Sequence, residues 1–293
     1  MLVLAIESAT EAVGVALADG DGVIASVSLR RGMRHVEAIA PSIAFVCRRA
    51  GASLSEVDVL AVDVGPGLFA GLRAGVGTAK ALGFALQVEV AGRTSLDVLA
   101  AAALLGAPDL RGQSSGMPVE VVPVVDARRG EVFSARFVVA DGREGPLDGS
   151  GAMLQIGEVR LDEPGILAER LRSSEVPVWL VGNGALRYSV AFQGIPTVEL
   201  GGSVLADPPV EVLSLLGVQA AMEGNTVLAE DLAPMYLRDA GARANFTRRT
   251  PSGHQRAVLS GIGPVVPGPT VPGPTVPGPA VPGPAVPGEQ CSP

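Results

Sequence analysis

Short apolar runs alternate with helical spacing along the first 105 residues, and the two patterns predict strands and helices in a definite order. Three apolar runs predict strands at 2–7, 13–18 and 23–29, the last two joined by the hairpin turn Asp19-Gly-Asp-Gly22. Apolar residues then recur at helical spacing from Val36 to Val46, which predicts a helix over 35–49. The pattern continues with a strand, a helix, a strand and a helix, at 57–64, 68–86, 88–91 and 96–105.

This order of three strands, helix, strand, helix and strand is half of a ribonuclease-H-like fold, in which two hairpins precede α/β crossovers. A less clear repeat of this order of elements follows. It begins with a predicted hairpin, in which strands at 119–126 and 131–139 are joined through Ala-Arg-Arg-Gly. A helix, a strand and a helix are then predicted at 166–172, 178–181 and 210–222. The sequence therefore predicts an α/β protein with a duplicated, two-lobed arrangement whose second lobe is smaller or degraded.

Composition changes most sharply near residue 250, and it divides the chain into three parts. We expect a first lobe over 1–110, a second lobe over 111–245 whose C-terminal segment returns to the first, and a tail over 250–293. From Val266 the tail repeats VPGPT, VPGPT, VPGPA and VPGPA. Proline removes amide donors and glycine resists ordering, so we expect this tail to be disordered. It is either a dispensable extension or a docking ligand for a proline-recognition module.

The overall composition excludes several classes of protein. The 293 residues are 47% hydrophobic and carry a net charge of −8, which makes the chain a poor phosphate-backbone binder on its own. Two cysteines, Cys47 and Cys291, make neither a disulfide framework nor a metal quartet. The sequence shows no signal-peptide pattern and no continuous apolar stretch of membrane-spanning length. We therefore expect a soluble, cytoplasmic protein without a membrane partner.

The helix predicted over 68–86 has an unusual face of small residues. Gly71, Gly75, Ala79 and Gly83 recur every four residues, and Gly77 lies between them. Four interior glycines cost about 4 kcal/mol of intrinsic helix stability relative to alanine, so close packing must offset the loss. The small face packs either on the protein's own sheet or on a helix of another subunit. In the second case polar residues beside it, Arg73 and Lys80, are candidate contacts.

Two glycine- or hydroxyl-containing turns are candidate phosphate sites. Gly65-Pro-Gly67 opens a helix but matches neither the Walker pattern nor G-x-G-x-x-G. In sugar kinases and actin-like ATPases, the hairpin that corresponds to 7–11 holds nucleotide phosphates. Here Glu7 is longer than the usual aspartate and Ala9 has no hydroxyl, which leaves Thr10 as a weak cofactor-binding candidate. The alternative is a plain hairpin turn capped by its own hydroxyl groups.

The small number of histidines argues against catalysis by this chain. His254 lies in the tail, so His35 is the folded part's only histidine, and we expect it to be partly exposed at a helix start. A metal site or a Ser-His-Asp triad needs partners that the sequence does not supply, so we expect no catalytic residue and no metal. The charged turn that contains Asp126, Arg128 and Glu131 is either solvated or orients a neighbouring lobe or ligand through Arg–carboxylate pairs.

Several motifs together resemble one family. They are LAIESATEAVGVAL, HVEAIAPSI, GPGLFAGLRAGVGTAK, VDARRGEVF and AEDLAPMYLRD, in order across roughly residues 1–240. This set resembles the TsaB (YeaZ-type) subunit of the bacterial tRNA threonylcarbamoyladenosine machinery. The resemblance implies a two-lobed actin-like ATPase fold and a non-catalytic scaffold. The tail lies outside it.

The resemblance also implies partners. The scaffold pairs with a catalytic paralogue, TsaD, which binds a metal through an HxxxH motif, and an ATPase, TsaE, joins them. The complex transfers a threonylcarbamoyl group to N6 of adenosine 37 of tRNA, which this subunit meets only indirectly. The chain is expected to form a homodimer when alone and to bind no cofactor tightly, with ATP or ADP confined to a subunit junction of the complex.

The resemblance implies pairing through helices at about 34–49 and 68–86. The corresponding interface candidates are His35, Ile39, Gly67, Phe69, Gly71, Arg73, Gly75, Ala79 and Lys80. Asp126, Arg128 and Glu131 belong to a family motif without an assigned role. Glu7 and Ala9 depart from the family's usual residues, which weakens the case for nucleotide binding. Leu68 and Ala70 stand where the family usually has hydroxyl residues, which makes the turn before the interface helix more apolar and is compatible with pairing. The competing hypothesis is a stand-alone, ATP-dependent phosphotransferase of the actin-like class.

Overall fold

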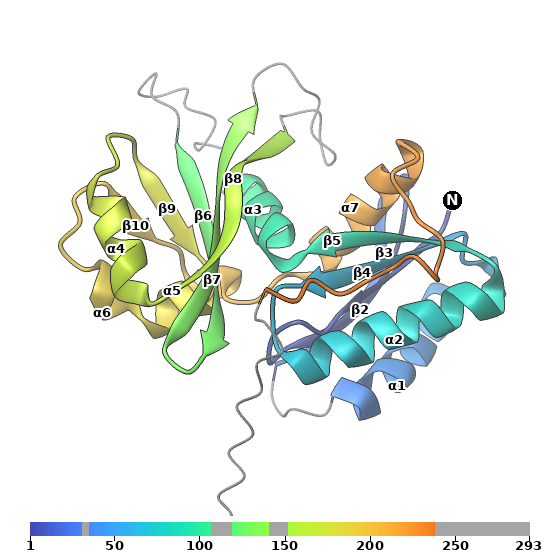
Figure 1. Ribbon diagram of the computed structural model, residues 1–293. Helices are drawn as coiled ribbons and strands as arrows, with labels where there is room; N and C mark the ends of the chain where they lie inside the picture. The colour runs from blue at the N-terminus through green and yellow to red at the C-terminus, as the bar shows by residue number, and fades with distance from the viewer. Residues whose placement is uncertain (31–34, 107–118, 141–151, 238–293) are drawn as a thin grey trace, which may run out of the picture. The chain divides into compact units, whose positions relative to one another are not determined.

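Five strands of the first half form one mixed sheet, as the computed structural model shows (Figure 1). The structure describes residues 1–30, 35–106, 119–140 and 152–237. The sheet order is β3-β2-β1-β4-β5, with antiparallel β1–β2 and β2–β3 pairs and parallel β1–β4 and β4–β5 pairs. The strands are β1 (Val3–Glu7), β2 (Val13–Asp19), β3 (Gly22–Leu29), β4 (Val59–Gly65) and β5 (Glu89–Thr94).

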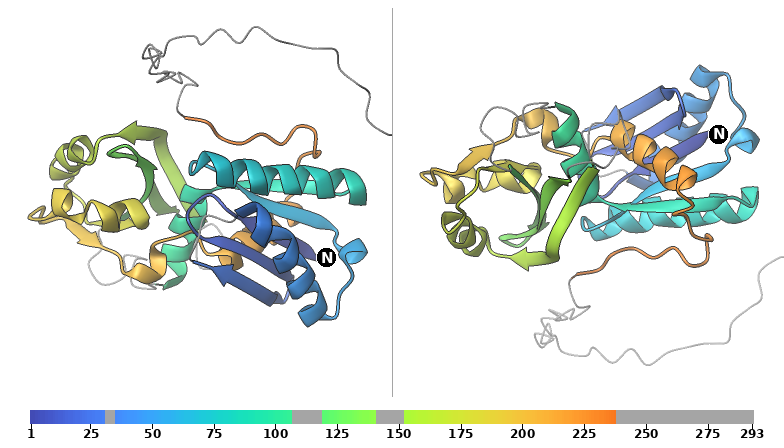
Figure 2. Two further views of the ribbon diagram at one scale, coloured as in Figure 1. Left: turned by 90° about the horizontal axis from the view of Figure 1, so that it is seen from below. Right: turned by 90° about the horizontal axis from the view of Figure 1, so that it is seen from above.

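Helices cover both faces of this sheet. Because side chains alternate along a strand, Leu4 and Ile6 of β1 face the helices α1 (His35–Ala50) and α2 (Phe69–Leu86). Val3 and Ala5 face the opposite side, where α3 (Ser95–Gly106) and α7 (Val210–Met222) pack. Figures 1 and 2 show α1 and α2 together on one side and α7 on the other. The central strand is therefore buried on both faces.

The second half forms another five-stranded sheet, in the order β10-β9-β6-β7-β8. Its strands are β6 (Glu120–Arg128), β7 (Glu131–Ala140), β8 (Ala152–Asp162), β9 (Val178–Val181) and β10 (Val198–Leu200). Strands β6, β7 and β8 pair antiparallel, and β9 and β10 follow in parallel. Read from β8 to β10, this order repeats that of the first sheet from β3 to β5. The repeat confirms the duplicated, actin-like fold.

The second sheet has as many strands as the first, because it includes β8 and β10, which the sequence analysis did not predict. The reduction lies in the helices that flank the sheet, α4 (Pro164–Arg172), α5 (Asn183–Arg187) and α6 (Ser189–Phe192), which are short. The chain also forms two short 3-10 helices, η1 (Leu54–Glu56) and η3 (Ser203–Leu205).

The chain returns to the first sheet after the second is complete. Helix α7 packs so closely there that a Cβ on Gly217 would lie 2.5 Å from the Cβ of Ala61. Val227 then forms a bridge with Val90 of β5, and Lys80 of α2 donates hydrogen bonds to the carbonyls of Glu230 and Leu232. The expected lobe boundary near 110 and the tail over 250–293 lie outside the described residues. Within the described ranges, no helix combines the length and apolar character that a membrane crossing requires.

The glycine face of α2 packs inward on the loop after β1. A Cβ on Gly71 would lie 2.0 Å from the carbonyl oxygen of Ser8, and one on Gly75 would lie 2.2 Å from the Ser8 hydroxyl. The Ser8 hydroxyl donates a hydrogen bond to the carbonyl of Gly71 at 2.9 Å. Further along, Gly83 accommodates Ala229 of the returning segment. Close packing within the chain therefore offsets the helix-propensity cost of these glycines.

Two glycines of α2 provide a direct test of this packing. Gly77 is exposed and has open space where a Cβ would point, so Gly77→Ala should stabilise the fold by about 1 kcal/mol and raise Tm by about 2–4 °C. Gly71→Ala should lower Tm, because its Cβ would clash with backbone of Ser8. Thermal unfolding followed by circular dichroism measures both. Equal shifts of the two variants would contradict the inward packing.

Candidate functional site

The loop between β1 and β2 is closed off by the start of α2. Ala9 accepts a hydrogen bond from the amide of Leu68 at 2.7 Å, and a Cβ on Gly67 would lie 2.2 Å from the same carbonyl. Thr10 is 1% exposed, and its hydroxyl accepts a hydrogen bond from the Ala12 amide at 3.2 Å. The Thr10 hydroxyl is thus already used within the turn. A contact between Thr10 and a phosphate stays a prediction.

His35 is part of the same closed arrangement. Its Nε2 lies 2.8 Å from the carbonyl oxygen of Thr10, and its ring lies 3.2 Å from where a Cβ on Gly71 would be. The residue is only 6% exposed, so the prediction of a partly exposed histidine is wrong. His35 joins the start of α1 to the loop and to α2.

Two buried carboxyl groups meet where β1 and β4 end. Glu7 is 1% exposed and accepts a hydrogen bond from the Ala9 amide at 2.8 Å. Asp63 is fully buried and accepts hydrogen bonds from the Gly65 amide at 2.6 Å and the Ser95 hydroxyl at 2.9 Å. The outer oxygens, Glu7 Oε2 and Asp63 Oδ2, have no hydrogen-bond partner in the described part of the chain other than one another's carboxyl.

The environment of this pair favours the protonated form of its carboxyls. Burial raises the pKa of the Glu7 carboxyl well above its ordinary value, and the charge of Asp63 raises it further. Burial also raises the pKa of Asp63, although hydrogen bonds from Glu7, Gly65 and Ser95 lower it. Of the two carboxyls, Glu7 has the pKa that both burial and the neighbouring charge raise. Glu7 can be singled out in the sequence as the carboxylate that ends the first strand, whereas nothing singles out Asp63, because the two meet only through the parallel pairing of their strands.

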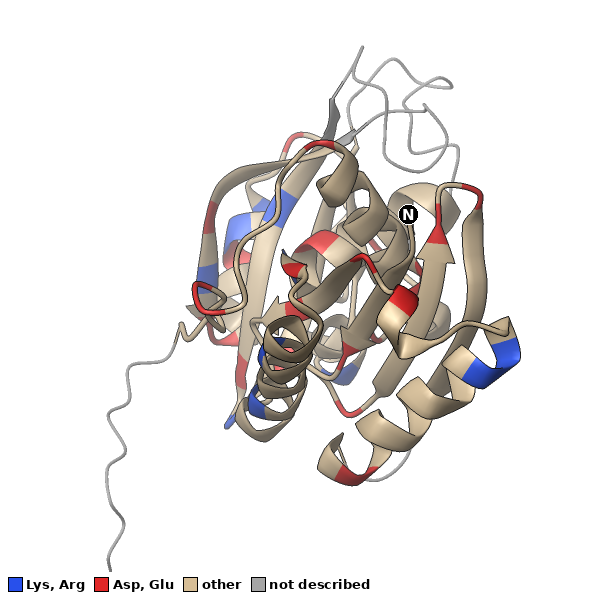
Figure 3. Cartoon of the chain, turned by 90° about the vertical axis from the view of Figure 1, so that its right-hand side faces the viewer, with Lys and Arg blue, Asp and Glu red and all other residues tan. Residues whose placement is uncertain are grey.

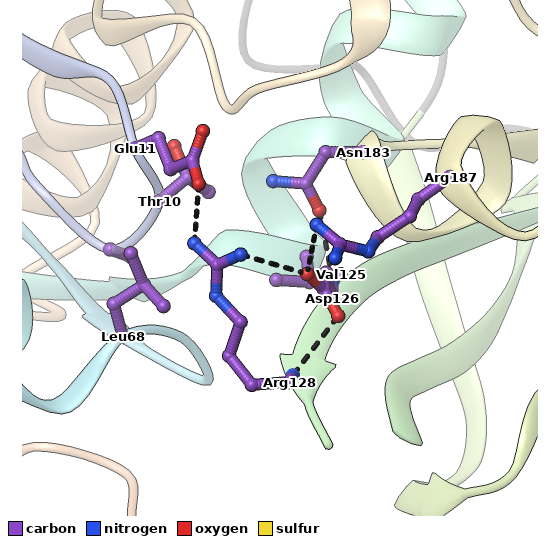
Figure 4. A pocket seen from close by; sticks show the side chains of 9 residues that line it. Thr10, Glu11, Leu68, Val125, Asp126, Arg128, Asn183 and Arg187 are labelled. Atoms are coloured by element: carbon purple, nitrogen blue, oxygen red, sulfur yellow. Dashed lines mark hydrogen bonds and ion pairs between the residues drawn. The ribbon is translucent and has the colours of Figure 1, made fainter. Parts of the chain in front are cut away.

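The charged turn between β6 and β7 lies across from this loop and makes the Arg–carboxylate pairs that the sequence allowed (Figure 4). Arg128 forms an ion pair with Glu11 of the β1–β2 loop, and its Nη1 lies 3.5 Å from Asp126. Arg187 of α5 lies 3.4 Å from the same Asp126 carboxylate. Arg128 and Arg129 both have left-handed backbone, with φ of 63° and 57°, which aims the Arg128 side chain at the first lobe. Glu131 begins β7 opposite Arg128.

A cavity of about 110 Å³ lies between these groups, lined by both lobes. Asn183 supports it by accepting a hydrogen bond from the Asp126 amide at 2.8 Å. Glu11 raises the pKa of the Arg128 guanidinium, so this cation stays charged and paired. The carboxylates of Glu11 and Asp126 thus pair with both arginines at this cavity. Among the described residues, no group of three or more His, Cys, Asp or Glu side chains is arranged to bind a metal.

The outward face of α1 and α2 has a different character. Four large apolar side chains are exposed on it, Val36 by 77%, Phe45 by 43%, Phe69 by 56% and Phe84 by 60%. The exposed positions between them are mostly small, namely Ala40, Pro41, Ala44, Ala70, Gly77, Ala81 and Ala85. Charge on α1 is confined to its two ends, with Glu37 in the first turn and Arg48 and Arg49 in the last (Figure 3). We call this surface the α1/α2 face.

Comparisons with known proteins identify the family. A family model described as TsaD, tRNA N6-adenosine threonylcarbamoyltransferase, matches residues 18–246. The tRNA threonylcarbamoyladenosine biosynthesis protein TsaB of Escherichia coli K12 is 30% identical over 239 residues, which cover 82% of this chain and 95% of that protein. The chain belongs to the TsaB (YeaZ-type) family.

Further relatives of the TsaB family agree. The TsaB protein of Bacillus subtilis is 25% identical over 252 residues, covering 84% of this chain and 98% of its own. The solved structure of YeaZ from Pseudomonas aeruginosa matches with a TM-score of 0.63 at 27% identity, covering 80% of this chain and 99% of that one. The family resemblance noted in the sequence is therefore confirmed, and the family match ends before the proline-rich tail.

The interface residues expected from the TsaB resemblance differ in exposure. Five of the nine candidates are buried against the chain itself: His35, Ile39, Gly71, Gly75 and Ala79. Gly67 is partly buried under Ala9, and Lys80 is partly buried and holds the returning segment. Phe69 and Arg73 are exposed, and the Arg73 guanidinium lies 4.1 Å above the Phe69 ring. Phe69 also contacts Tyr236, with ring centroids 5.5 Å apart.

The interface candidates from the sequence include Phe69 but not the other exposed large residues of the α1/α2 face, which are Val36, Phe45 and Phe84. Both sides of α2 carry small residues at helical spacing, and periodicity identifies a face without saying which one is buried. Four exposed aromatic or aliphatic residues on the same two helices were the available signal.

The buried carboxyl pair predicts a specific pH dependence. The pKa of Glu7 is raised in the folded chain, so stability should fall as pH rises from about 4, where the unfolded chain loses its proton, through the raised pKa. Glu7→Gln supplies a permanent N–H donor to Asp63 and should flatten this part of the profile. Urea unfolding between about pH 5 and 8 measures the difference. Glu199→Gln, at an exposed strand position, is the matched control. Parallel profiles for Glu7→Gln and the parent would refute the raised pKa of Glu7.

Proposed function

We propose that this chain is a scaffold subunit of the machinery that makes tRNA N6-threonylcarbamoyladenosine, and that it pairs with a TsaD-type catalytic subunit through the α1/α2 face. The observation that carries the proposal is the exposed, nearly uncharged character of that face, on the helices of a chain that belongs to the TsaB family. The names of the relatives point to the synthesis of tRNA threonylcarbamoyladenosine, and the exposed face points to a role in binding another protein.

The chemistry of the face supports a protein partner. Interface cores are depleted of charge and enriched in aromatic residues, with arginine as the favoured cation. Phe69, Phe84 and Phe45 provide the aromatic area, and Arg73 stacks on Phe69 at the edge. The small residues between them, such as Gly77 and Ala81, allow the backbone of a partner helix to approach closely. A contiguous apolar surface of this kind marks an interaction site.

The interior supports a non-catalytic role for this chain. His35 is buried, with its Nε2 against the Thr10 carbonyl, so it is not presented as a general base. Ser8 donates its hydroxyl to Gly71 and is fully buried, so it is not available as a nucleophile. We therefore assign the transfer chemistry to the partner.

The proposed complex has further components besides the TsaD-type subunit. A TsaE-type ATPase joins the complex, and tRNA is met through the partner, in keeping with a net charge of −8 on this chain. Without its partner the chain covers the same face by forming a homodimer. The chain holds no cofactor tightly, and ATP or ADP binds only at a subunit junction of the complex. The assembly works in the cytoplasm, where its tRNA substrate is found.

Pairing is tested on the exposed side of α2. Gly77→Arg places a long cation at the centre of the α1/α2 face, with open space around the new side chain in the free protein. We expect the affinity for the co-expressed TsaD-type subunit to fall at least about 30-fold, equivalent to about 2 kcal/mol, as at an interface hot spot. Calorimetry or co-purification measures it.

The matched control is Gly165→Arg, a substitution of an exposed glycine in α4 that also has open space around it. It should leave pairing unchanged, and both variants should keep the circular dichroism spectrum of the parent. Normal pairing by Gly77→Arg would refute the assignment of the interface.

The competing phosphotransferase hypothesis is tested with nucleotide. The cavity at the lobe junction is only about 110 Å³, smaller than the pockets of about 300–1,000 Å³ that hold drug-sized ligands, and its arginines are paired. The isolated chain should therefore give no saturable heat with Mg-ATP in the micromolar range. Micromolar binding in calorimetry would favour a phosphotransferase instead.

A further inference from the structure

The second lobe contains a cavity that the proposed function does not use. It has a volume of about 200 Å³ and lies between β7, β8 and α4, on the opposite side of the second sheet from α3. It is separate from the α1/α2 face and shares no lining residue with the cavity at the lobe junction. Its walls combine an apolar floor with charged groups at the rim.

An irregularity in the β7–β8 ladder opens this cavity. Ser134 pairs with Arg160 and Arg136 pairs with Ile156, so the three residues from Gly157 to Val159 stand opposite the single residue between them. Gly157 has φ of +80°, and its carbonyl accepts a hydrogen bond from the Gln155 side chain at 2.8 Å. The bulge moves the backbone of β8 away from its neighbour and carries Glu158 and Arg160 to the cavity rim.

The floor of the cavity is apolar with one polar group. Val122, Leu167 and Leu171 line it and are each buried. Ser134 also lines it and is 4% exposed, yet its hydroxyl makes no hydrogen bond within the described ranges. This hydroxyl is therefore open to the cavity, where a ligand can form a hydrogen bond with it.

The rim carries both signs of charge. Arg136 makes two hydrogen bonds to Glu120, at 2.8 and 2.6 Å, and Arg170 forms an ion pair with Asp162, so these two cations are already neutralised. Glu158 and Arg160 line the same cavity, and neither has a hydrogen bond or ion pair among the described residues. The site thus offers one free anion and one free cation, two residues apart on one strand.

We propose that this cavity binds a free α-amino acid with an aliphatic side chain. Arg160 and the Ser134 hydroxyl bind its carboxylate, because a guanidinium matches carboxylate geometry. Glu158 binds its ammonium group. The aliphatic side chain lies on the floor formed by Leu167 and Leu171, where the hydrophobic effect favours it. The volume of about 200 Å³ suits a molecule of this size and is below that of a typical nucleotide pocket.

The test is calorimetry of the full chain with L-leucine and two analogues that each lack one charge. L-Leucine should bind saturably with a Kd of about 1 mM or tighter. 4-Methylpentanoate lacks the ammonium and 3-methylbutylamine lacks the carboxylate, so each should bind about tenfold more weakly, the equivalent of one charge-assisted hydrogen bond of about 1.4 kcal/mol. Equal binding of L-leucine and either analogue would overturn the assignment of an amino acid.

Three variants localise the binding. Arg160→Met and Glu158→Gln are exposed substitutions that should each weaken L-leucine about tenfold. Ser134→Leu should fill the cavity and abolish binding while Tm stays close to that of the parent. Arg172→Met, at an exposed ion pair with Glu169 outside the cavity, is the control and should change nothing. Absence of saturable binding to the parent, or full binding by Ser134→Leu, would overturn the proposal. Neither outcome bears on pairing through α1 and α2.

Discussion

The close approach of α2 to the loop after β1 is the contact on which the rest of the structure depends. No residue larger than glycine fits at 71 or 75, because backbone and hydroxyl atoms of Ser8 occupy the space of a side chain. This contact buries the β1–β2 loop, brings His35 against Thr10 and fixes the turn at Gly67. It also determines which side of α2 points outward. The exposure of Phe69, Gly77 and Phe84 on the outer side of α2 and the burial of the β1–β2 loop are therefore two results of the same packing contact.

The same contact explains why the carboxyl edge of the sheet is occupied by the protein itself. Parallel strands β1 and β4 end together and bring Glu7 and Asp63 side by side in a region that α2 and α3 enclose. In an open nucleotide-binding lobe this edge faces a ligand. Here burial raises the pKa of both acids, and Ser95 of α3 donates a hydrogen bond to Asp63. Across the junction, Glu11 and Arg128 join the loop to the second lobe at a partly exposed ion pair, which contributes orientation more than stability.

Much of this fold could be predicted from periodicity, and the limits of that prediction are physical. The strands and helices of the first lobe, and the duplication, follow from apolar runs of two different periods. Strand β8 was missed because the bulge at Gly157 interrupts its alternation, and β10 because it has only three residues. In α2 the small-residue period was recognised, but it carries no information about direction, so Gly75 was assigned to a partner. Asp63 was missed because its partner Glu7 lies 56 residues away and only the parallel pairing brings them together.

A helix that is constrained on both sides has little freedom to change during evolution. The inner side of α2 admits only glycine at 71 and 75 and holds a buried alanine at 79, because other parts of the chain lie against it. If the proposed pairing holds, the outer side must match the shape of another protein. Most surface helices accumulate substitutions on their solvent side, whereas α2 has no such side available. We expect sequence drift in this chain to concentrate in the short helices of the second lobe, so that α2 identifies relatives even when the rest of the chain has diverged.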